Sequence, residues 1–213
     1  MKMGVLGSGS VGQAIGAKLL ELGHDVMIGT RTAGKLSGWQ KSTRGKGRIG
    51  SFSETAAHGE MVFNATRGSA SLEALKMAGA ANLGGKILVD ISNPLGFSKG
   101  MPPSLTICNT DSLGEQIQRV FPSVKVVKTL NTVTATIMVN PQQVAGGDHH
   151  VFVSGNDAQA KGQVTEILKS FGWIHILDLG DITTARGVEM YLLLWLHLLD
   201  ASQTGIFNIK VMK

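Results

Sequence analysis

The residues whose types and spacing most clearly indicate a binding site form a glycine-rich segment close to the start of the chain. The segment consists of Gly7, Ser8, Gly9, Ser10, Val11 and Gly12, in the order G-x-G-x-x-G. It follows a short apolar run and precedes apolar residues at helical spacing, which is the context that a dinucleotide-binding loop requires. Gly7 permits a tight turn, Gly9 lets the backbone of the loop approach a pyrophosphate, and Gly12 lets the following helix pack on the preceding strand. Free amides in the first helical turn are expected to hold the phosphates.

Two further kinds of glycine-rich loop compete with a dinucleotide site at this segment. A triphosphate-binding loop has a lysine after its last glycine. This chain has Gln13 there, so that kind of loop is excluded. A glycine-rich tight turn that binds no ligand uses the same residues, and it stays open as the alternative.

The second candidate group lies where the next strand is expected to end. When the bound dinucleotide has a free ribose hydroxyl, an Asp or Glu about 20 residues after the loop usually binds that hydroxyl. Here the residue 18 positions after Gly12 is Thr30, followed by Arg31 and then Lys35. A carboxylate repels a ribose phosphate, whereas guanidinium and hydroxyl groups bind it. The sequence therefore predicts NADP rather than NAD, unless Arg31 and Lys35 are merely solvated loop charges.

Basic residues are concentrated around this position. The formal net charge is +5, and the stretch between Asp25 and Glu54 contains no acid but six cations: Arg31, Lys35, Lys41, Arg44, Lys46 and Arg48. Such a window indicates an anionic partner: nucleic acid, a membrane surface or a phosphorylated small molecule. The neighbouring dinucleotide loop and a content of only three Trp, one Tyr and seven Phe argue against nucleic acid. The cations from Lys41 to Arg48 are expected to lie in a plain solvated loop.

The remaining reactive residues give no catalytic acid, base or metal site. His149 and His150 lack a third ligand at matching spacing, and both are expected to be exposed, on opposite faces of a strand. His197 lies in an apolar helix and is expected in the core or at an interface. Lys125 or Lys128 could protonate a carbonyl substrate, but a lysine beside a buried strand is expected to be an edge charge.

The elements that must position these residues alternate between strands and helices. Strands are expected at residues 2–6, 25–29, 49–51, 61–66, 86–91, 124–130, 150–153 and 174–177. Helices are expected at residues 11–22, 71–80, 111–121, 158–171 and 183–201, with Asp111 as the cap of the third. The alternation predicts an α/β fold of Rossmann type, a doubly wound and mostly parallel sheet with a C-terminal helical extension.

The length of 213 residues corresponds to one large domain with a modest extension. Residues 1–180 are expected to form an NADP-binding Rossmann-like domain, and residues 181–213 a helical extension that packs on it or on a second subunit. The apolar run 190–199 is far shorter than the roughly 20 residues of a bilayer span. A helix that is apolar on most sides is fully buried or shared with another subunit, which predicts a homodimer.

The compartment is predicted from three further features. The apolar run at the start of the chain is too short and too rich in glycine for a signal peptide. The single cysteine, Cys108, cannot close an intrachain disulfide, and no motif around it gives it a role. We therefore expect a soluble, cytoplasmic protein that binds no membrane.

Motifs along nearly the whole chain carry a resemblance to a known family. These motifs are the first 30 residues after Met1, then DISNPL (90–95), VVKTLNTVTA (126–135), DHHVFVSGND (148–157) and DLGDITTARGVE (178–189). In this order they resemble the NADP oxidoreductases that use a deazaflavin, coenzyme F420. The resemblance implies that Thr30, Arg31 and Lys35 bind the ribose phosphate. It also implies a nicotinamide pocket that contains Ala65, Thr66, Asn93, Pro94, Asn131 and Ala135, the last two at the ends of the segment 131–135.

One residue departs from the expected family pattern. Arg67 follows Ala65 and Thr66, where a more apolar or proline-containing turn is expected. The resemblance also extends to domains of membrane ferric reductases, although no membrane half is expected for this chain. The unexpected Arg67 concerns the binding of the second substrate, a deazaflavin or a flavin, and does not affect the expected NADP site.

The predicted function is an NADPH-dependent oxidoreductase that passes hydride between NADP(H) and a deazaflavin or flavin-like acceptor. Ring-to-ring hydride transfer needs positioning more than proton chemistry, so no catalytic residue is nominated. A non-catalytic sensor of NADP(H) is the main alternative. A dehydrogenase of small hydroxy acids or imines is a third, but it generally needs a long helical substrate domain, and only about 30 residues follow Asp181.

Overall fold

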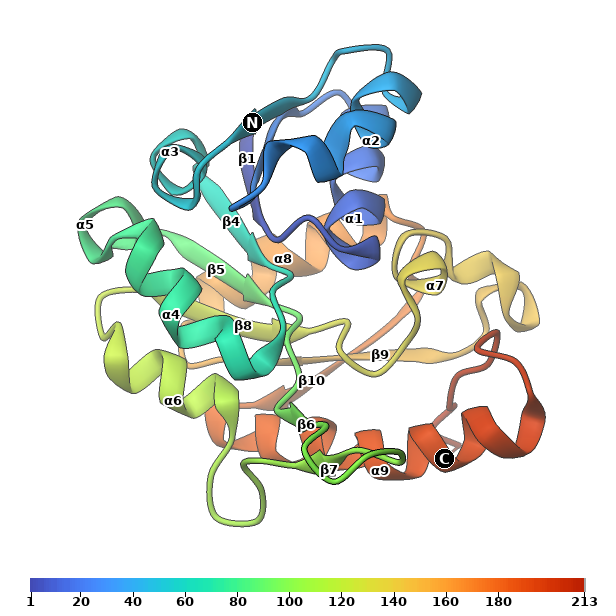
Figure 1. Ribbon diagram of the computed structural model, residues 1–213. Coiled ribbons are helices and arrows are strands. Elements are labelled where there is room, and N and C mark those ends of the chain that lie inside the picture. The colour runs from blue at the N-terminus through green and yellow to red at the C-terminus, as the bar shows by residue number, and fades with distance from the viewer. Residues whose placement is uncertain (213) are drawn as a thin grey trace.

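The computed structural model describes residues 1–212 and is built around an eight-stranded sheet (Figure 1). In sheet order the strands are β10 (His175–Gly180), β9 (His150–Ser154), β8 (Lys125–Thr129), β5 (Ile87–Asp90), β4 (Met61–Asn64), β1 (Lys2–Leu6), β2 (Asp25–Gly29) and β3 (Arg48–Gly50). Only the β8–β9 pair is antiparallel among these described strands. The expected doubly wound, mostly parallel sheet of Rossmann type is therefore confirmed.

Helices cover both faces of this sheet (Figure 1). The α-helices are α1 (Ser10–Glu21), α2 (Ser37–Ser42), α3 (Phe52–His58), α4 (Gly68–Ala78), α5 (Ala80–Leu83), α6 (Leu113–Val120), α7 (Ala135–Val139), α8 (Ala158–Ser170) and α9 (Ala185–Ser202). Short 3-10 turns are η1 (Ala33–Leu36), η2 (Pro141–Gln143), η3 (Ala145–Gly147) and η4 (Ile182–Thr184), and a small hairpin pairs β6 (Leu95–Gly96) with β7 (Ser104–Leu105).

The side chains of each strand alternate between two apolar layers. In β4, Met61 and Phe63 pack with the layer of α1, α7 and α8, whereas Val62 packs with the layer of α3 to α6. This alternation follows from the two-residue period of a strand. Both faces of the sheet are therefore buried, and the polar residues that act on a ligand must lie at the strand ends and in the loops.

Several elements differ from the sequence-based expectation. β4 ends at Asn64 rather than at residue 66, and α3 and α7 were not expected. The prediction that Asp111 caps α6 is wrong, because the Ser112 hydroxyl accepts the hydrogen bond from the Glu115 amide at 3.1 Å. Asp111 instead pairs with Arg119 at 2.7 Å, and hydrogen bonding to this guanidinium lowers the pKa of Asp111 to about 2.

The last helix, α9, has one buried face and one exposed apolar face. Val188 and Leu192 are buried, whereas Leu193, Leu194 and Leu198 are 41 %, 55 % and 36 % exposed. A fully buried helix is therefore the wrong alternative, and sharing with a second subunit stays a prediction. None of the helices within residues 1–212 combines the length and the apolar content that a bilayer span needs. Lys213, at the end of the predicted extension, lies outside the described residues.

The structure corrects one of the two alternatives for His197 and the expectation for His149. His197 is exposed on α9, so the core alternative for this residue is wrong. The expectation that His149 is exposed is also wrong, because its side chain lies inside the protein with Nε2 2.8 Å from the Pro141 carbonyl oxygen. His149 also packs edge-on against Trp173, at 5.0 Å between ring centroids. Both contacts give His149 a structural role.

His150 holds the C-terminal tail against the start of β9. Its backbone amide donates to the Ile209 carbonyl at 3.1 Å, and its Nδ1 accepts from the Val211 amide at 3.2 Å. Burial lowers the pKa of His150, and nearby His175 and Lys210 lower it further. The fold therefore favours the neutral imidazole, which is the form that accepts the bond from Val211.

We expect the stability of the protein to fall as the pH drops through the histidine range. A pKa below the ordinary value of 6.5 means that the unfolded chain takes up the proton first, so stability is lost as the pH falls below 6.5. Thermal unfolding of the native protein and of His150→Gln, measured between about pH 7.5 and 5, tests this. The melting temperature of the variant should fall less on acidification than that of the native protein. Equal falls would contradict a contribution of His150 to the pH dependence.

Candidate functional site

The glycine-rich segment forms a tight loop between β1 and α1 that is closed on one side and open on the other. Gly7 has a φ of +119°, and a Cβ placed there would lie 2.5 Å from the Ala65 carbonyl oxygen. A Cβ at Gly12 would lie 2.0 Å from the Gly7 carbonyl oxygen, so helix and strand pack backbone to backbone. A Cβ at Gly9 would meet no heavy atom within 4 Å. The loop is therefore packed at Gly7 and Gly12 and open to a ligand at Gly9.

The first turn of α1 presents unpaired backbone donors at this open side. The first hydrogen bond of the helix runs from the Gln13 amide to the Gly9 carbonyl at 2.9 Å. Among the described residues, the amides of Ser10, Val11 and Gly12 have no acceptor, and no side chain caps the helix. Amides in such a position, together with the helix dipole, favour a phosphate.

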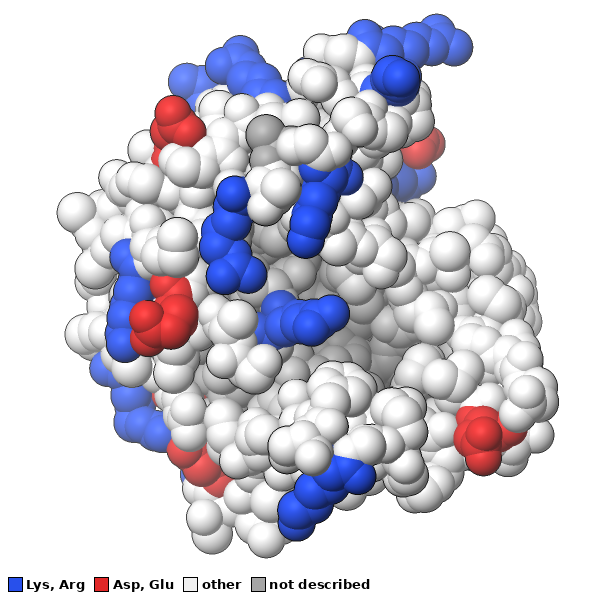
Figure 2. Space-filling model, viewed as in Figure 1, with Lys and Arg blue, Asp and Glu red and all other residues white. Residues whose placement is uncertain are grey.

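The loop after β2 brings cations to the same edge of the sheet. The Thr30 hydroxyl lies 3.0 Å from the Ser8 hydroxyl, which ties this loop to the glycine loop. Arg31 and Lys35 are exposed, and no ion pair among the described residues involves either of them. Lys and Arg side chains lie along the upper and left sides of a hollow in the middle of the face in Figure 2, with the acidic side chains farther out. This edge therefore suits a polyanion.

Two adjoining cavities continue from the glycine loop along the carboxyl ends of the strands. The first has a volume of about 410 Å³ and the second about 440 Å³. Val11, Ile91 and Asn93 line both of them. The pair of cavities lies beside the crevice between β1 and β4, where the strand order reverses and where ligands bind in open α/β sheets.

Most residues of the expected nicotinamide pocket line one of these cavities. Asn131 and Ala135 line the first cavity, and Ala65 and Thr66 line the second. Asn93 lines both, whereas Pro94 is buried next to it and lines neither. The exposed Arg67 also lines the second cavity, directly before α4. The structure thus brings these residues together, apart from the buried Pro94.

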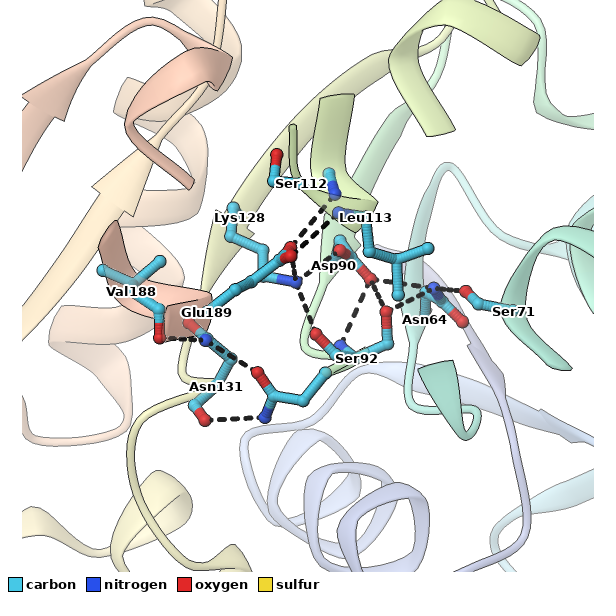
Figure 3. Close-up of polar contacts among 12 residues, drawn as sticks. Asn64, Ser71, Asp90, Ser92, Ser112, Leu113, Lys128, Asn131, Val188 and Glu189 are labelled. Carbon is cyan, nitrogen blue, oxygen red and sulfur yellow. Dashed lines mark hydrogen bonds and ion pairs between the residues drawn. The ribbon is translucent and has the colours of Figure 1, made fainter. Parts of the chain in front are cut away.

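A row of buried polar side chains lies beneath the cavities, at or directly before the last positions of three neighbouring strands (Figure 3). Asn64, Asp90 and Lys128 are register partners across β4, β5 and β8. The Asn64 amide donates to Asp90 Oδ1 at 2.8 Å, and Lys128 Nζ lies 2.8 Å from Asp90 Oδ2. The Thr66 hydroxyl donates to Asn64 Oδ1 at 2.7 Å, so the row is connected to the second cavity.

Glu189 of α9 completes this cluster from the other side. Its Oε1 lies 2.8 Å from Lys128 Nζ, and its two oxygens accept from the amides of Leu113 and Gly114 at 2.8 and 3.1 Å. Burial alone lowers the pKa of Lys128, but the carboxylates of Asp90 and Glu189 outweigh burial and raise it. The expectation of an edge charge is therefore wrong for Lys128, while Lys125 pairs with Asp157 at 3.1 Å at the far end of β8.

The chemistry of Lys128 follows from its surroundings. The ammonium is fully buried and also donates to the Ser92 carbonyl oxygen. A group with three acceptors and a raised pKa keeps its proton, so Lys128 is unsuited to protonating a substrate. Sequence reasoning missed Asp90, Glu189 and Asn64 altogether. Their signal is a polar residue at the end of each of two apolar strands, and an acid between the apolar residues Val188 and Met190 of a helix.

The open position in the glycine loop gives a direct prediction. Gly9→Ala should leave the melting temperature nearly unchanged, because the new Cβ meets nothing within 4 Å and the backbone φ of −76° suits any residue. The methyl group should nevertheless occupy the space of a bound phosphate and weaken dinucleotide binding at least about tenfold. Gly12→Ala is the matched variant, which should destabilise the protein. Unchanged binding by Gly9→Ala would exclude the loop as a phosphate site.

These features define a Rossmann-type protein with a dinucleotide loop and a basic edge. The family model described as NADP oxidoreductase, coenzyme F420-dependent, matches residues 2–94. A solved structure of a candidate F420-dependent NADP reductase from Arthrobacter sp. FB24 is 54 % identical, with a TM-score of 0.97 over the whole of both chains. The chain belongs to this family of F420-dependent NADP oxidoreductases.

Curated proteins of two kinds are also similar to this chain. The F420-dependent NADP reductase of Methanocaldococcus jannaschii is 28 % identical over 89 % of this chain and 88 % of its own length. The metalloreductase STEAP3 of Rattus norvegicus is 29 % identical over 88 % of this chain but only 36 % of its own length. The chain thus spans about a third of the metalloreductases that it matches and nearly all of the archaeal reductase.

Proposed function

We propose that the protein transfers hydride between NADP(H) and a deazaflavin or flavin-like acceptor. One observation carries this proposal: the glycine loop is open at Gly9 and bonded to Thr30 through Ser8, and the residues that follow it, Ser10 and Val11, line the adjoining cavities. The glycine loop and these cations fit the adenosine half of NADP, including its ribose phosphate. The names and sequences of the family members support the same activity.

The cavities support a reaction between two ring systems. They share Val11, Ile91 and Asn93, so a ring in one cavity can lie against a ring in the other. Bound NADP(H) supplies or accepts the hydride. The protein binds, orients and shields the two rings, and this orientation lowers the barrier by up to about 7–11 kcal/mol. Among the described lining residues, Arg67 is the only one that is ionisable. This agrees with a transfer that needs no acid or base.

Absorbance spectroscopy tests the activity. The protein is mixed with NADPH and, in separate reactions, with the deazaflavin, FMN or FAD, while the nicotinamide absorbance band is followed. We expect turnover with at least one of the three acceptors. Binding of NADPH without turnover of any acceptor would favour the alternative function, a non-catalytic NADP(H) sensor. A protein that does not bind NADPH would contradict both.

We also propose that a second copy of the chain covers the exposed face of α9. Leu193, Leu194 and Leu198 form this face, and large exposed side chains in one apolar row often mark an interface. In this arrangement residues 181–212 form an extension that packs on residues 1–180 and on the second subunit. Sedimentation at micromolar concentration should give a dimer, and Leu194→Glu should give a folded monomer. A native protein that sediments as a monomer would contradict this proposal.

A further inference from the structure

We infer that Lys128 and Glu189 are positioning residues, which act on the cofactor through Asn93 and Asn131 in the floor of the cavities. This inference rests on the proposed function, because it assumes that the nicotinamide ring lies over this floor. Neither charged residue lines a cavity, and both are about 1 % exposed. Their effect must therefore pass through the residues that they hold.

The first half of the connection runs from the ammonium to the floor. Lys128 Nζ donates to the Ser92 carbonyl oxygen and lies 2.8 Å from Glu189 Oε1 (Figure 3). Ser92 directly precedes Asn93, which lines both cavities. The bond to the Ser92 carbonyl therefore fixes the peptide that carries Asn93.

The second half of the connection runs from the floor of the cavities to the carboxylate of Glu189. Asn93 Nδ2 donates to the Asn131 carbonyl at 2.9 Å, and Asn131 Nδ2 donates back to Asn93 Oδ1 at 2.9 Å. Asn131 Nδ2 also donates to the Val188 carbonyl at 3.0 Å, and Val188 directly precedes Glu189. Covalent and hydrogen bonds thus form a closed ring, in which the segment after β5, the end of β8 and the start of α9 hold each other.

The charges matter to this ring more than the size of the side chains. Glu189 uses both oxygens, one shared between Lys128 and the Gly114 amide and the other for the Leu113 amide. A glutamine at this position must turn its NH₂ group toward one of these donors, in either orientation of its amide. Glu189→Gln therefore loses the contacts of one oxygen, either to Leu113 or to Lys128 and Gly114, and in both cases the negative charge beside Lys128, while it preserves the volume of the side chain.

Two variants and one matched control test this inference. Glu189→Gln weakens the ring by removing the charge beside Lys128, and Lys128→Met combined with Glu189→Gln breaks the ring while the net charge of Asp90, Lys128 and Glu189 stays the same. Arg186→Met is the control, because Arg186 also ties α9 to α6, through Glu115 at 2.5 Å, but lines neither cavity. All three proteins are first checked for cooperative unfolding.

The readout is binding of two ligands that differ in the nicotinamide half. NADPH carries this half, whereas 2′,5′-ADP carries only the adenosine and the ribose phosphate. In the ring variants the Kd of NADPH should rise about tenfold, the equivalent of roughly one hydrogen bond, while that of 2′,5′-ADP changes less than about twofold. Fluorescence of bound NADPH should also shift in these variants, because it reports the surroundings of the nicotinamide ring. Arg186→Met should leave both Kd values and the fluorescence nearly unchanged.

Three results would overturn the inference. Equal losses of affinity for both ligands would mean that the cluster only stabilises the fold. An unchanged ratio of the two Kd values in both ring variants would mean that the ring does not position the nicotinamide. The same selective loss in Arg186→Met would assign the effect to the docking of α9. A native protein that binds neither ligand would instead refute the proposed function itself, and this inference with it.

Discussion

Lys128→Met is expected to lower the free energy of unfolding by about 3–5 kcal/mol. The substitution leaves the carboxylates of Asp90 and Glu189 buried without their shared cation. Breaking a buried ion pair costs far more than the pair contributes, because the remaining charge can neither be solvated nor neutralised without a shift in pKa. Equilibrium unfolding in urea, with the midpoint and slope compared to those of the native protein, measures this loss.

Lys125→Met is the matched control for that measurement. Both lysines belong to β8, and both form an ion pair, but the side chains of Lys125 and Asp157 are 38 % and 33 % exposed. A pair with this much solvent contributes at most about 1 kcal/mol. Similar small losses in the two variants would show that Lys128 is solvated in the folded protein, and the buried cluster would then be an incorrect description.

Arg31→Ala is expected to weaken binding of NADPH by about 1.5–3 kcal/mol, roughly ten- to a hundredfold, with little effect on NADH. The reason is that the guanidinium would contact the ribose phosphate, which NADH lacks. Arg31 is exposed and belongs to no ion pair among the described residues, so removal of the side chain breaks none. Titration calorimetry with both nucleotides measures the two affinities.

Lys41→Ala provides the comparison for Arg31→Ala. Lys41 lies in the same basic window, near the end of α2, and its side chain is exposed. If the long-range field of the window attracted the cofactor, both substitutions would weaken NADPH to a similar degree, and more so at low salt. Direct contact predicts an effect at Arg31 alone. Parallel losses of NADPH and NADH in Arg31→Ala would contradict a role in phosphate recognition.

The sheet and the glycine loop could be predicted because their signals are local. Strands such as β1 and β4 are apolar runs between turns, and α1 repeats its apolar residues over three turns. The helices α3 and α7 have only seven and five residues, too few to establish a helical period. The cap of α6 was misplaced by one residue, because Asp111 and Ser112 are both common caps and only their contacts distinguish them.

The buried cluster could not be predicted, because it depends on how strands pair. Asp90 and Lys128 are 38 residues apart in the chain, and they become neighbours only when β5 and β8 pair in a particular register. Glu189 reaches them only because α9 folds back over α6 and β8. β8 contains two lysines and α9 two acids, and nothing in the sequence shows that Lys128 and Glu189 are the two that become partners in the structure.

The affinity of the native protein for NADPH relative to NADH is the most direct test of the proposed site for the ribose phosphate. Titration calorimetry under identical salt and pH gives both dissociation constants without any acceptor. We expect NADPH to bind at least about tenfold more tightly, because in the proposed site Thr30, Arg31 and Lys35 would contact a phosphate that NADH lacks. Equal affinities, or no binding of either nucleotide, would contradict it.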